Sequence, residues 1–427
     1  MPDGRVLIAL ADGPLVASPT WTRFDELTNA RCSGFDISTG RQSEFDVVET
    51  GSAQVFWADR NQTLNDPDLV GRQIMLQAYD PVAAAWVPQF RGIIDEPDFD
   101  VHPSGVKSDV TFNCVDIMDF VGGIEFAADG SFGDAGGPTG VVFYDSGPVN
   151  DRIEQILTEC GLASTRYVVF SGNAILVETL YDLGDSALAA LRDAVDAEFP
   201  GIGLLYVDKQ GRIVFHGRFA RLDPEGTAAS ASPGAWDFAS WEAGDGAAVD
   251  ASPSTVAQIR SFSFNYPLSR VINQYQSWAR NTTNTPDVQI ASDATSITAY
   301  GLRTRSAPDL ILEGHKTNGN TAADECQLFC DYYVANYASP ARNVRSVTFK
   351  ALRPDDVRAE YLWSLMTGIE ISDRVTLTVA DAGATAEEYF VEGLSIQVRA
   401  LNPEHDYMEV TPNLSPAAYF TDDVFNP

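Results

Sequence analysis

The sequence predicts a mainly β, multidomain protein with an α+β insertion: two β-barrel or sandwich domains plus a smaller α+β domain. Short segments of alternating hydrophobicity, parted by Gly, Asn, Asp and Pro, fill both ends of the chain. Two stretches of helical spacing lie in the middle third. At 427 residues the chain also exceeds the size at which a single core stops growing.

The first β domain is expected over residues 1–120. Its candidate strands lie at 5–10, 30–37, 43–49, 52–58, 72–80, 87–101 and 108–120. Residues 121–146 follow as a glycine-rich linker or long loop. Its glycines match neither GxGxxG nor GxxxxGK[ST], so a phosphate cradle is not indicated.

Residues 147–222 read as a compact α+β domain of two helices and a hairpin. Asn150 is expected to cap the first helix, which ends at Gly161. Asp185 or Ser186 is expected to cap the second, which ends at Pro200. A hairpin with its turn at 209–211 follows at once.

The rest of the chain divides by composition and periodicity. Residues 223–256 are an Ala/Ser/Gly/Pro-rich surface excursion, and residues 257–340 combine β segments with one long amphipathic helix that ends before Pro340. That helix carries an apolar stripe of Cys326, Phe329, Cys330, Tyr333, Val334 and Tyr337. Residues 341–412 form the second β domain, and residues 413–427 a C-terminal arm.

The balance of charge restricts the ligands. With 28 basic and 60 acidic residues the net charge is −32, which disfavours contact with phosphate backbones. The acidity suits either solubility or the lining of a conduit through which DNA passes without binding. The five scattered cysteines are expected to be reduced and mostly buried. The N-terminus lacks a signal-peptide h-region, and no window has the ~18 apolar residues of a membrane span, so a soluble protein of a reducing compartment is expected.

Chemistry-bearing patterns are scarce. The four histidines, at 102, 216, 315 and 405, have no metal-ligand spacing, and no GxSxG elbow occurs. The acidic run Asp95 to Asp100 offers hard oxygen ligands for Ca²⁺, but it also fits a solvated strand end. We therefore expect no catalytic residues, no metal site and no cofactor.

The stretch Ser38 to Asp68 reads as strand, turn and strand. Alternation places Ala53, Val55 and Trp57 on one face, and Gly51 is expected to permit the turn. Arg41 and Glu44 are expected near the base of the hairpin, as an ion pair or a subunit contact. The four candidates for a structural or interface role are thus Arg41, Glu44, Gly51 and Trp57.

This same stretch resembles the N-terminal signature of minor tail proteins of long-tailed actinobacterial phages. Further segments follow in the order of that family, among them FRGIIDEPDFD, RIEQILTECGL, VINQYQSWA and EEYFVEGLSIQVRALNPEHDYMEVTPNLSP. One departure is WADRNQ, where Trp57 and Ala58 replace the usual aliphatic residue and Asn. The family is similar to the baseplate hub of contractile-tailed phages.

The resemblance implies a structural virion protein, made in the host cytoplasm and placed at the tail tip. It implies two hub-type β domains, assembly as a homotrimeric ring that closes the tail tube, and no enzymatic activity. Implied partners are the distal tail protein, the tape measure protein and fibre or other host-recognition proteins. DNA would pass through the ring without specific binding, and no membrane segment is involved.

Two alternatives stay open. One is the distal tail protein, a hexameric adaptor, against which the long α+β insertion argues. The other is an acidic β-rich glycosidase acting on cell-wall sugars, which needs two inward carboxylates in an aromatic cleft.

Overall fold

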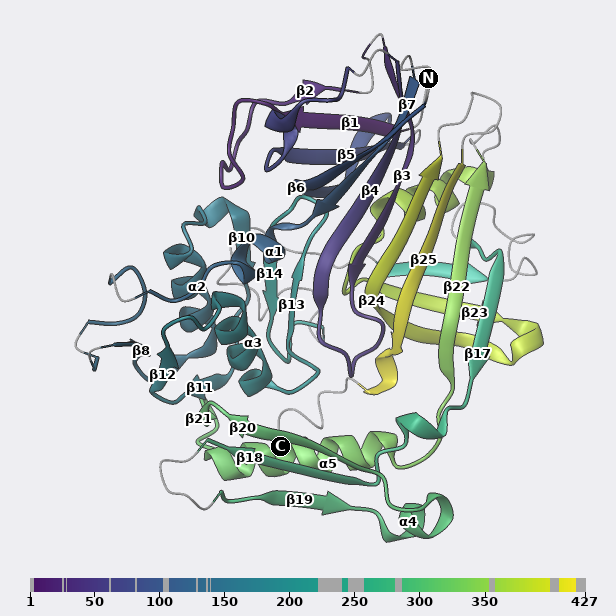
Figure 1. Cartoon of the computed structure of the whole chain (residues 1–427). Helices are drawn as coiled ribbons and strands as arrows, with labels where there is room; N and C mark the ends of the chain where they lie inside the picture. The colour runs from purple at the N-terminus through teal and green to yellow at the C-terminus, as the bar shows by residue number, and fades with distance from the viewer. Residues whose placement is uncertain are drawn as a thin grey trace.

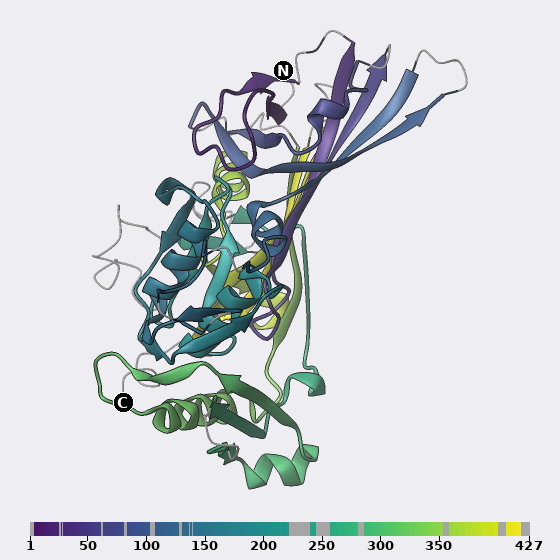
Figure 2. The ribbon, with the colours of Figure 1, turned by 60° about the vertical axis from the view of Figure 1, so that its left-hand side comes forward.

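The structure is a computed structural model, and it is mainly β (Figure 1). It describes residues 4–24, 27, 29–60, 63–80, 83–102, 107–127, 130–135, 137–138, 140–221, 240–244, 257–280, 286–352, 358–399 and 407–419. Among these residues, fourteen strands form one connected sheet. Several small sheets and most of the helices lie to one side of it and beneath it (Figures 1 and 2).

The N-terminal β region follows the expected all-β pattern. Its strands are β1 (Gly4–Ala9), β2 (Thr22–Arg23), β3 (Ala30–Gly40), β4 (Glu49–Arg60), β5 (Gln73–Asp80), β6 (Ala85–Val101) and β7 (Lys107–Val115). They pair antiparallel in the order β3-β4-β7-β6-β5-β1-β2. The last expected strand stops early, because Asp116 accepts a hydrogen bond from Met118 N and starts the short helix α1 (Ile117–Gly122).

The hairpin of β3 and β4 differs from the prediction at its turn. The expected strand at 43–49 is a loop over residues 41–48, and the strand before it is the longer β3. Gly40 ends β3 at a φ of +83°, a conformation that glycine adopts without a steric cost. Gly51 lies inside β4 and not in the turn, so that part of the prediction is wrong.

The C-terminal β region is built from strands far apart in sequence. They are β15 (Ser240–Gly244), β16 (Ala257–Gln258), β17 (Ser261–Asn265), β22 (Asn343–Leu352), β23 (Arg374–Val379), β24 (Ala384–Arg399) and β25 (Tyr407–Pro416). The helix α6 (Arg358–Gly368), not predicted, lies between β22 and β23 and buries Leu362, Trp363, Leu365 and Met366. Most of the predicted excursion and the end of the arm, residues 222–239, 245–256 and 420–427, lie outside the described residues.

One strand joins the two β regions. The first half of β24, residues 384–390, pairs with β23, and its second half, residues 393–399, pairs with β3. Along its other edge β24 pairs with β25. The expected two β domains therefore share a continuous sheet and one large apolar core.

The α+β unit packs beside this sheet. Its helices are α2 (Val149–Glu159) and α3 (Ala187–Glu198), and its strands are β8 (Val141–Tyr144), β9 (Gly147–Pro148), β10 (Tyr167–Val169), β11 (Ala174–Leu176), β12 (Thr179–Asp182), β13 (Leu204–Val207) and β14 (Ile213–His216). Ser186 caps α3 as predicted, whereas α2 has Pro148 and not Asn150 at its N-cap. The expected linker 121–146 contributes buried Phe126, Val142 and Tyr144 to this unit's core, so these residues are packed.

The segment expected at 257–340 ends in a helix-covered sheet at the lower edge of the molecule (Figure 1). Its elements are β18 (Gln274–Ala279), β19 (Gln289–Ser292), α4 (Ala294–Tyr300), β20 (Thr304–Leu310), β21 (Leu312–His315) and α5 (Ala322–Tyr337). The predicted stripe of α5 is buried except for Val334, which is partly buried. Since β21 pairs with β11, this segment and the α+β unit form one core.

Candidate functional site

The four predicted site residues all belong to the β3–β4 hairpin, whose loop lies where the two β regions and the α+β unit meet. Arg41 and Glu44 lie in the 41–48 loop and are 4 % and 1 % exposed. Gly51 and Trp57 lie in β4. The site is therefore described from this hairpin outward.

Arg41 is paired with Glu392 of β24. Its Nε lies 2.8 Å from Glu392 Oε2, and its backbone N–H donates to the Glu392 carbonyl at 2.9 Å. The side chains of both residues are buried. Buried charges of this kind need a partner, because an unpaired one loses its hydration without compensation.

Glu392 has a second cation, Arg221, from the end of the α+β unit. The Nη1 and Nη2 atoms of Arg221 donate to Glu392 Oε1 and Oε2 at 2.6 and 3.1 Å, and Ser415 Oγ also donates to Oε1. Burial alone would raise the pKa of Glu392, but Arg221 and Arg41 together hold it well below its ordinary value. Glu392 is thus a fixed negative charge shared by two arginines.

A bulge in β24 makes this contact possible. The pairing of β24 shifts register between Val391 and Gly393, where the strand changes partner from β23 to β3. A Cβ at position 393 would lie 2.6 Å from the Arg41 carbonyl oxygen and 2.7 Å from that of Thr39. Only glycine allows β24 and the backbone of residues 39–41 to approach this closely.

The network continues into the α+β unit. Arg221 Nε donates to Ser372 Oγ at 3.2 Å, and His216 Nδ1 lies 3.1 Å from the same hydroxyl. Burial and, secondarily, Arg221 lower the pKa of His216 well below its ordinary value, so the ring is neutral. One buried polar network therefore links the N-terminal β region, the C-terminal β region and the α+β unit.

Glu44 is bound to a different part of the molecule. Arg270 Nη2 pairs with Glu44 Oε1, and Tyr337 of α5 donates its hydroxyl to the same oxygen at 3.1 Å. The guanidinium of Arg270 also lies 5.2 Å from the ring centroid of Phe45. The expected Arg41–Glu44 pair is thus replaced, among the described residues, by two separate pairs: Arg41 with Glu392 at the start of the loop, and Glu44 with Arg270 in its middle.

Gly51 and Trp57 each contact a side chain of a neighbouring segment within the N-terminal β region. The Gly51 N–H donates to Asp116 Oδ2 at 2.6 Å, and a Cβ there would lie 2.5 Å from that oxygen. Burial raises the pKa of Asp116 to about 7, although backbone N–H groups bind its carboxylate. Trp57 is 2 % exposed and contacts Phe112, with ring centroids 5.8 Å apart. The predicted alternation of β4 is confirmed, since Ala53 and Val55 are buried beside it.

A second buried triad was not predicted. Arg218, just after β14, has its Nε 3.2 Å from Glu198 Oε1 and its Nη1 2.6 Å from Glu325 Oε2. It thereby fastens α3 to α5 through side chains that are all fully buried. A single acid inside an apolar run, Glu392 in YFVEGLSI, is the sequence signal for the first network; Glu198 and Glu325 lie close to other acids and carry no such signal.

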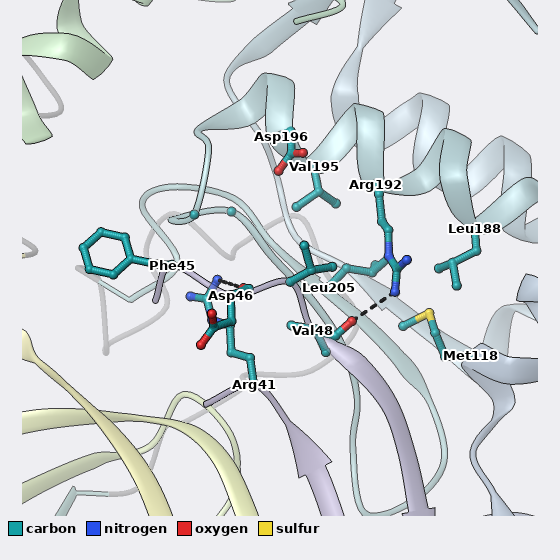
Figure 3. A pocket seen from close by; sticks show the side chains of 13 residues that line it. Arg41, Phe45, Asp46, Val48, Met118, Leu188, Arg192, Val195, Asp196 and Leu205 are labelled. Atoms are coloured by element: carbon teal, nitrogen blue, oxygen red, sulfur yellow. Dashed lines mark hydrogen bonds between the residues drawn. The ribbon is translucent and has the colours of Figure 1, made fainter. Parts of the chain in front are cut away.

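The loop also covers a pocket of about 140 Å³ against α3 (Figure 3). Its apolar side chains include Val48, Met118, Leu188, Val195 and Leu205. The charged side chains that line it are Arg41, Asp46, Arg192 and Asp196. Arg192 reaches across from α3 and donates to the Val48 carbonyl at 3.2 Å.

The acidic run lies at the end of β6, where Asp95, Glu96, Asp98 and Asp100 are exposed. Within the described ranges no three His, Cys, Asp or Glu residues are grouped as a metal site would need. Cys326 and Cys330 are buried on α5, and burial raises the pKa of their thiols to about 11 and about 12. Over the same ranges, no helix has the length and apolar character of a membrane span.

Comparison with known proteins places the fold. The sequence matches no protein-family model, and a search of curated sequences finds no relative. Among solved structures, the tail protein from Neisseria meningitidis MC58 matches with a TM-score of 0.58 and 12% identity, covering 98% of each chain. The 43 kDa tail protein of prophage MuSo2 from Shewanella oneidensis matches with a TM-score of 0.53 and 8% identity, over 96% of this chain and 98% of that one. The chain thus shares the fold of these two tail proteins over almost its whole length.

Proposed function

We propose that the protein is a structural subunit of a phage tail tip, a hub component that forms a ring, closes the tail tube and links it to host-recognition proteins. The observation that carries this proposal is the fold, shared with two tail proteins from end to end. The expected order of segments in the sequence supports the same assignment. On this proposal the chain acts in the virion by assembly and not by catalysis.

The buried networks support a scaffold role. Arg41, Arg221 and Glu392 fasten three parts of the chain at one point, and Arg218 fastens two helices with Glu198 and Glu325. Charges buried in this way fix one arrangement of the parts, because any other arrangement leaves a charge unpaired. A ring subunit needs such fixed geometry to repeat the same contact around an axis.

We propose a homotrimer, with the distal tail protein, the tape measure protein and fibre proteins as neighbours and an acidic surface past which DNA moves without binding. Two measurements on the purified chain test the ring directly: native mass spectrometry gives the number of copies, and class averages from electron microscopy give the symmetry. Three copies around a threefold axis are expected, and labelled antibody against the chain should mark the tail tip of virions.

Two results would overturn the proposal in favour of the alternatives. A sixfold ring would favour the hexameric distal tail adaptor. Release of sugars from purified cell wall by the pure protein would favour the glycosidase. A protein that stays monomeric at high concentration and is absent from purified virions would leave no support for the tail role.

A further inference from the structure

The strand β19 lies at the lower edge of the molecule and has one free edge (Figure 1). It pairs antiparallel with β18 without a bulge, and no other strand of the described residues pairs with it. Its sequence, QIAS, holds no proline and no charged residue, which are the residues that commonly block an exposed edge. This edge is therefore open to an added strand.

The backbone groups at this edge are directed outward. The Asp293 N–H donates to the Asn273 carbonyl at 2.9 Å, on the side of β18. In a strand the N–H and C=O groups of successive residues point to opposite edges, so those of Ile290 and Ser292 point away from β18. Two donors and two acceptors thus line the free edge, and no strand among the described residues receives them.

A groove of about 640 Å³ runs beside the same edge, between the end of β19 and the second half of α5. Small side chains form most of its surface: Ala291, Ser292, Ala294, Ala335, Ala338 and Ser339. The side chain of Ala291 faces α5, because its cross-strand partner Tyr275 stacks on Tyr333 with ring centroids 4.3 Å apart. An added strand would therefore send every second side chain into the groove and turn the others toward the open face, where Ile290 is 49 % exposed.

The charged residues that line the groove are both acidic, Asp293 and Asp331. Each carboxylate accepts a hydrogen bond from a neutral donor, a backbone N–H for Asp293 and the Gln327 amide for Asp331. Neither is in an ion pair with a cation of the described residues. Cys330 Sγ donates to the Gln289 carbonyl at 3.4 Å, so the next residue, Asp331, lies near the start of β19, whereas Asp293 follows its last residue. The groove thus offers two carboxylates, spaced along the strand, to a cationic ligand.

We propose that β19 and this groove bind an extended segment of a partner protein as an added strand, with lysine or arginine at alternate positions facing α5. The backbone of the segment pairs with Ile290 and Ser292, and its basic side chains reach Asp331 and Asp293 along the groove. Between the basic residues, β-branched residues cover Ile290 on the open face. The inference rests on groups of this chain alone, so it does not depend on the proposed ring.

Charge disfavours a second copy of the chain in this place. Two β19 edges paired across a twofold axis would bring Asp293 and Asp331 of both copies toward one another. The net charge of −32 adds to that repulsion. A basic segment is attracted by the same charges.

The test is a titration of the full chain with acetyl-Val-Lys-Val-Lys-Val-amide at about 150 mM salt, followed by saturation-transfer NMR. A dissociation constant on the order of 1 mM is expected for so short a peptide. Acetyl-Lys-Lys-Val-Val-Val-amide has the same composition without the alternation and should bind at least about five-fold more weakly. Acetyl-Val-Glu-Val-Glu-Val-amide has the opposite charge and should not bind at about 10 mM. Equal binding of the two lysine peptides, or no binding of the alternating one at about 10 mM, overturns the proposal.

Variants locate the site. Ser292→Pro removes an N–H at the free edge and keeps the pairing with β18, since proline is accepted where the N–H of an edge strand faces solvent. It should weaken binding of the alternating lysine peptide about ten-fold. Asp331→Asn removes one exposed acid of the groove and should weaken binding about five-fold. Glu154→Gln, at an exposed acid on α2, is the charge-matched control and should change nothing.

Three outcomes would contradict the assigned site. Equal effects of Asp331→Asn and Glu154→Gln would show that only the net charge attracts the peptide. Unchanged binding by Ser292→Pro would exclude pairing at the edge; hydrogen exchange in peptides of β18 shows whether this variant keeps the sheet, and Asp331→Asn carries the test if it does not. Dimerisation that Ser292→Pro abolishes, without binding of the lysine peptide, would assign the edge to a second copy of the chain.

Discussion

Replacing Arg41 by alanine tests the junction most directly. The substitution removes the 2.8 Å pair with Glu392 and leaves that buried carboxylate with Arg221 and Ser415. Removing one partner of a buried ion pair costs about 3 to 5 kcal/mol. Because Arg221 remains, we expect the lower end, about 3 kcal/mol, and a larger loss for Arg221→Ala, which removes two hydrogen bonds to Glu392.

Hydrogen exchange measured by mass spectrometry is the suitable assay, because a chain with several units need not unfold in one step. Peptides covering 36–44 and 388–396 report on the two strands that the pair connects. A loss of about 3 kcal/mol corresponds to exchange roughly 100-fold faster in these peptides. Arg345→Ala, an exposed arginine on β22, is the control and should leave them unchanged.

A double-mutant cycle separates the pair from general damage. Arg41→Ala combined with Glu392→Ala should be far from additive, whereas Arg41→Ala combined with Arg345→Ala should be additive. Acceleration of less than five-fold in both peptides, or an additive Arg41–Glu392 cycle, would refute the reasoning that this pair holds the junction.

Three further predictions follow from the same region. The pKa of Glu392 is lowered in the folded protein, so its ionised carboxylate stabilises the fold fully above the ordinary pKa of 4.5, and this stabilisation is lost as the pH falls below that value. The free energy of unfolding, measured as a function of pH, should show this loss, and the loss should be smaller in Glu392→Gln. Burial raises the pKa of Asp116 to about 7, so the folded state keeps a proton that the unfolded state loses near the ordinary pKa of 3.8. The free energy of unfolding should therefore fall as the pH rises between these two values. Asp116→Asn should remove this pH dependence in denaturant melts at about pH 5 and 8. Trp57→Ala should destabilise the N-terminal β region by about 3 to 5 kcal/mol, measured by hydrogen exchange in peptides of β4, because it empties a site in the core, whereas a loss below about 1 kcal/mol would place Trp57 outside it.

Local signals predicted much of the secondary structure. The helix α3 follows from Ser186 as cap and its apolar spacing, and α5 follows from its stripe and Pro340. The helix α6 is not predicted, because the strand patterns on both sides of it indicate one continuous β domain over residues 341–412. Its buried residues nevertheless have helical spacing: Leu362, Trp363, Leu365 and Met366. The strand predicted at 43–49 falls in the 41–48 loop: Phe45, Val47 and Val48 are residues typical of a strand, yet Val47 is 61 % exposed.

The sequence predicts the position of the charged residues of the site but not their partners. Arg41 and Glu44 are predicted near the base of a hairpin, whereas they lie in the loop that joins β3 to β4. Their partners, Glu392 and Arg270, lie more than 200 residues away, and no local pattern encodes a contact across such a separation. The prediction that Gly51 permits the turn is also wrong. A glycine is needed there because Asp116, 65 residues away in the sequence, approaches it closely, and local sequence patterns do not encode such a contact.

The strand β24 gives the molecule a mechanical property. Because its two halves are hydrogen-bonded along one edge to different strands of the same sheet, a pull along its axis loads the β23 pairing and the β3 pairing in series. The bulge at Val391 and Gly393 lies between those halves, and the Glu392 side chain is held there by two arginines. Force entering one β region is thereby transmitted to the other through the covalent backbone of β24, and two arginines hold the residue at which its pairing changes.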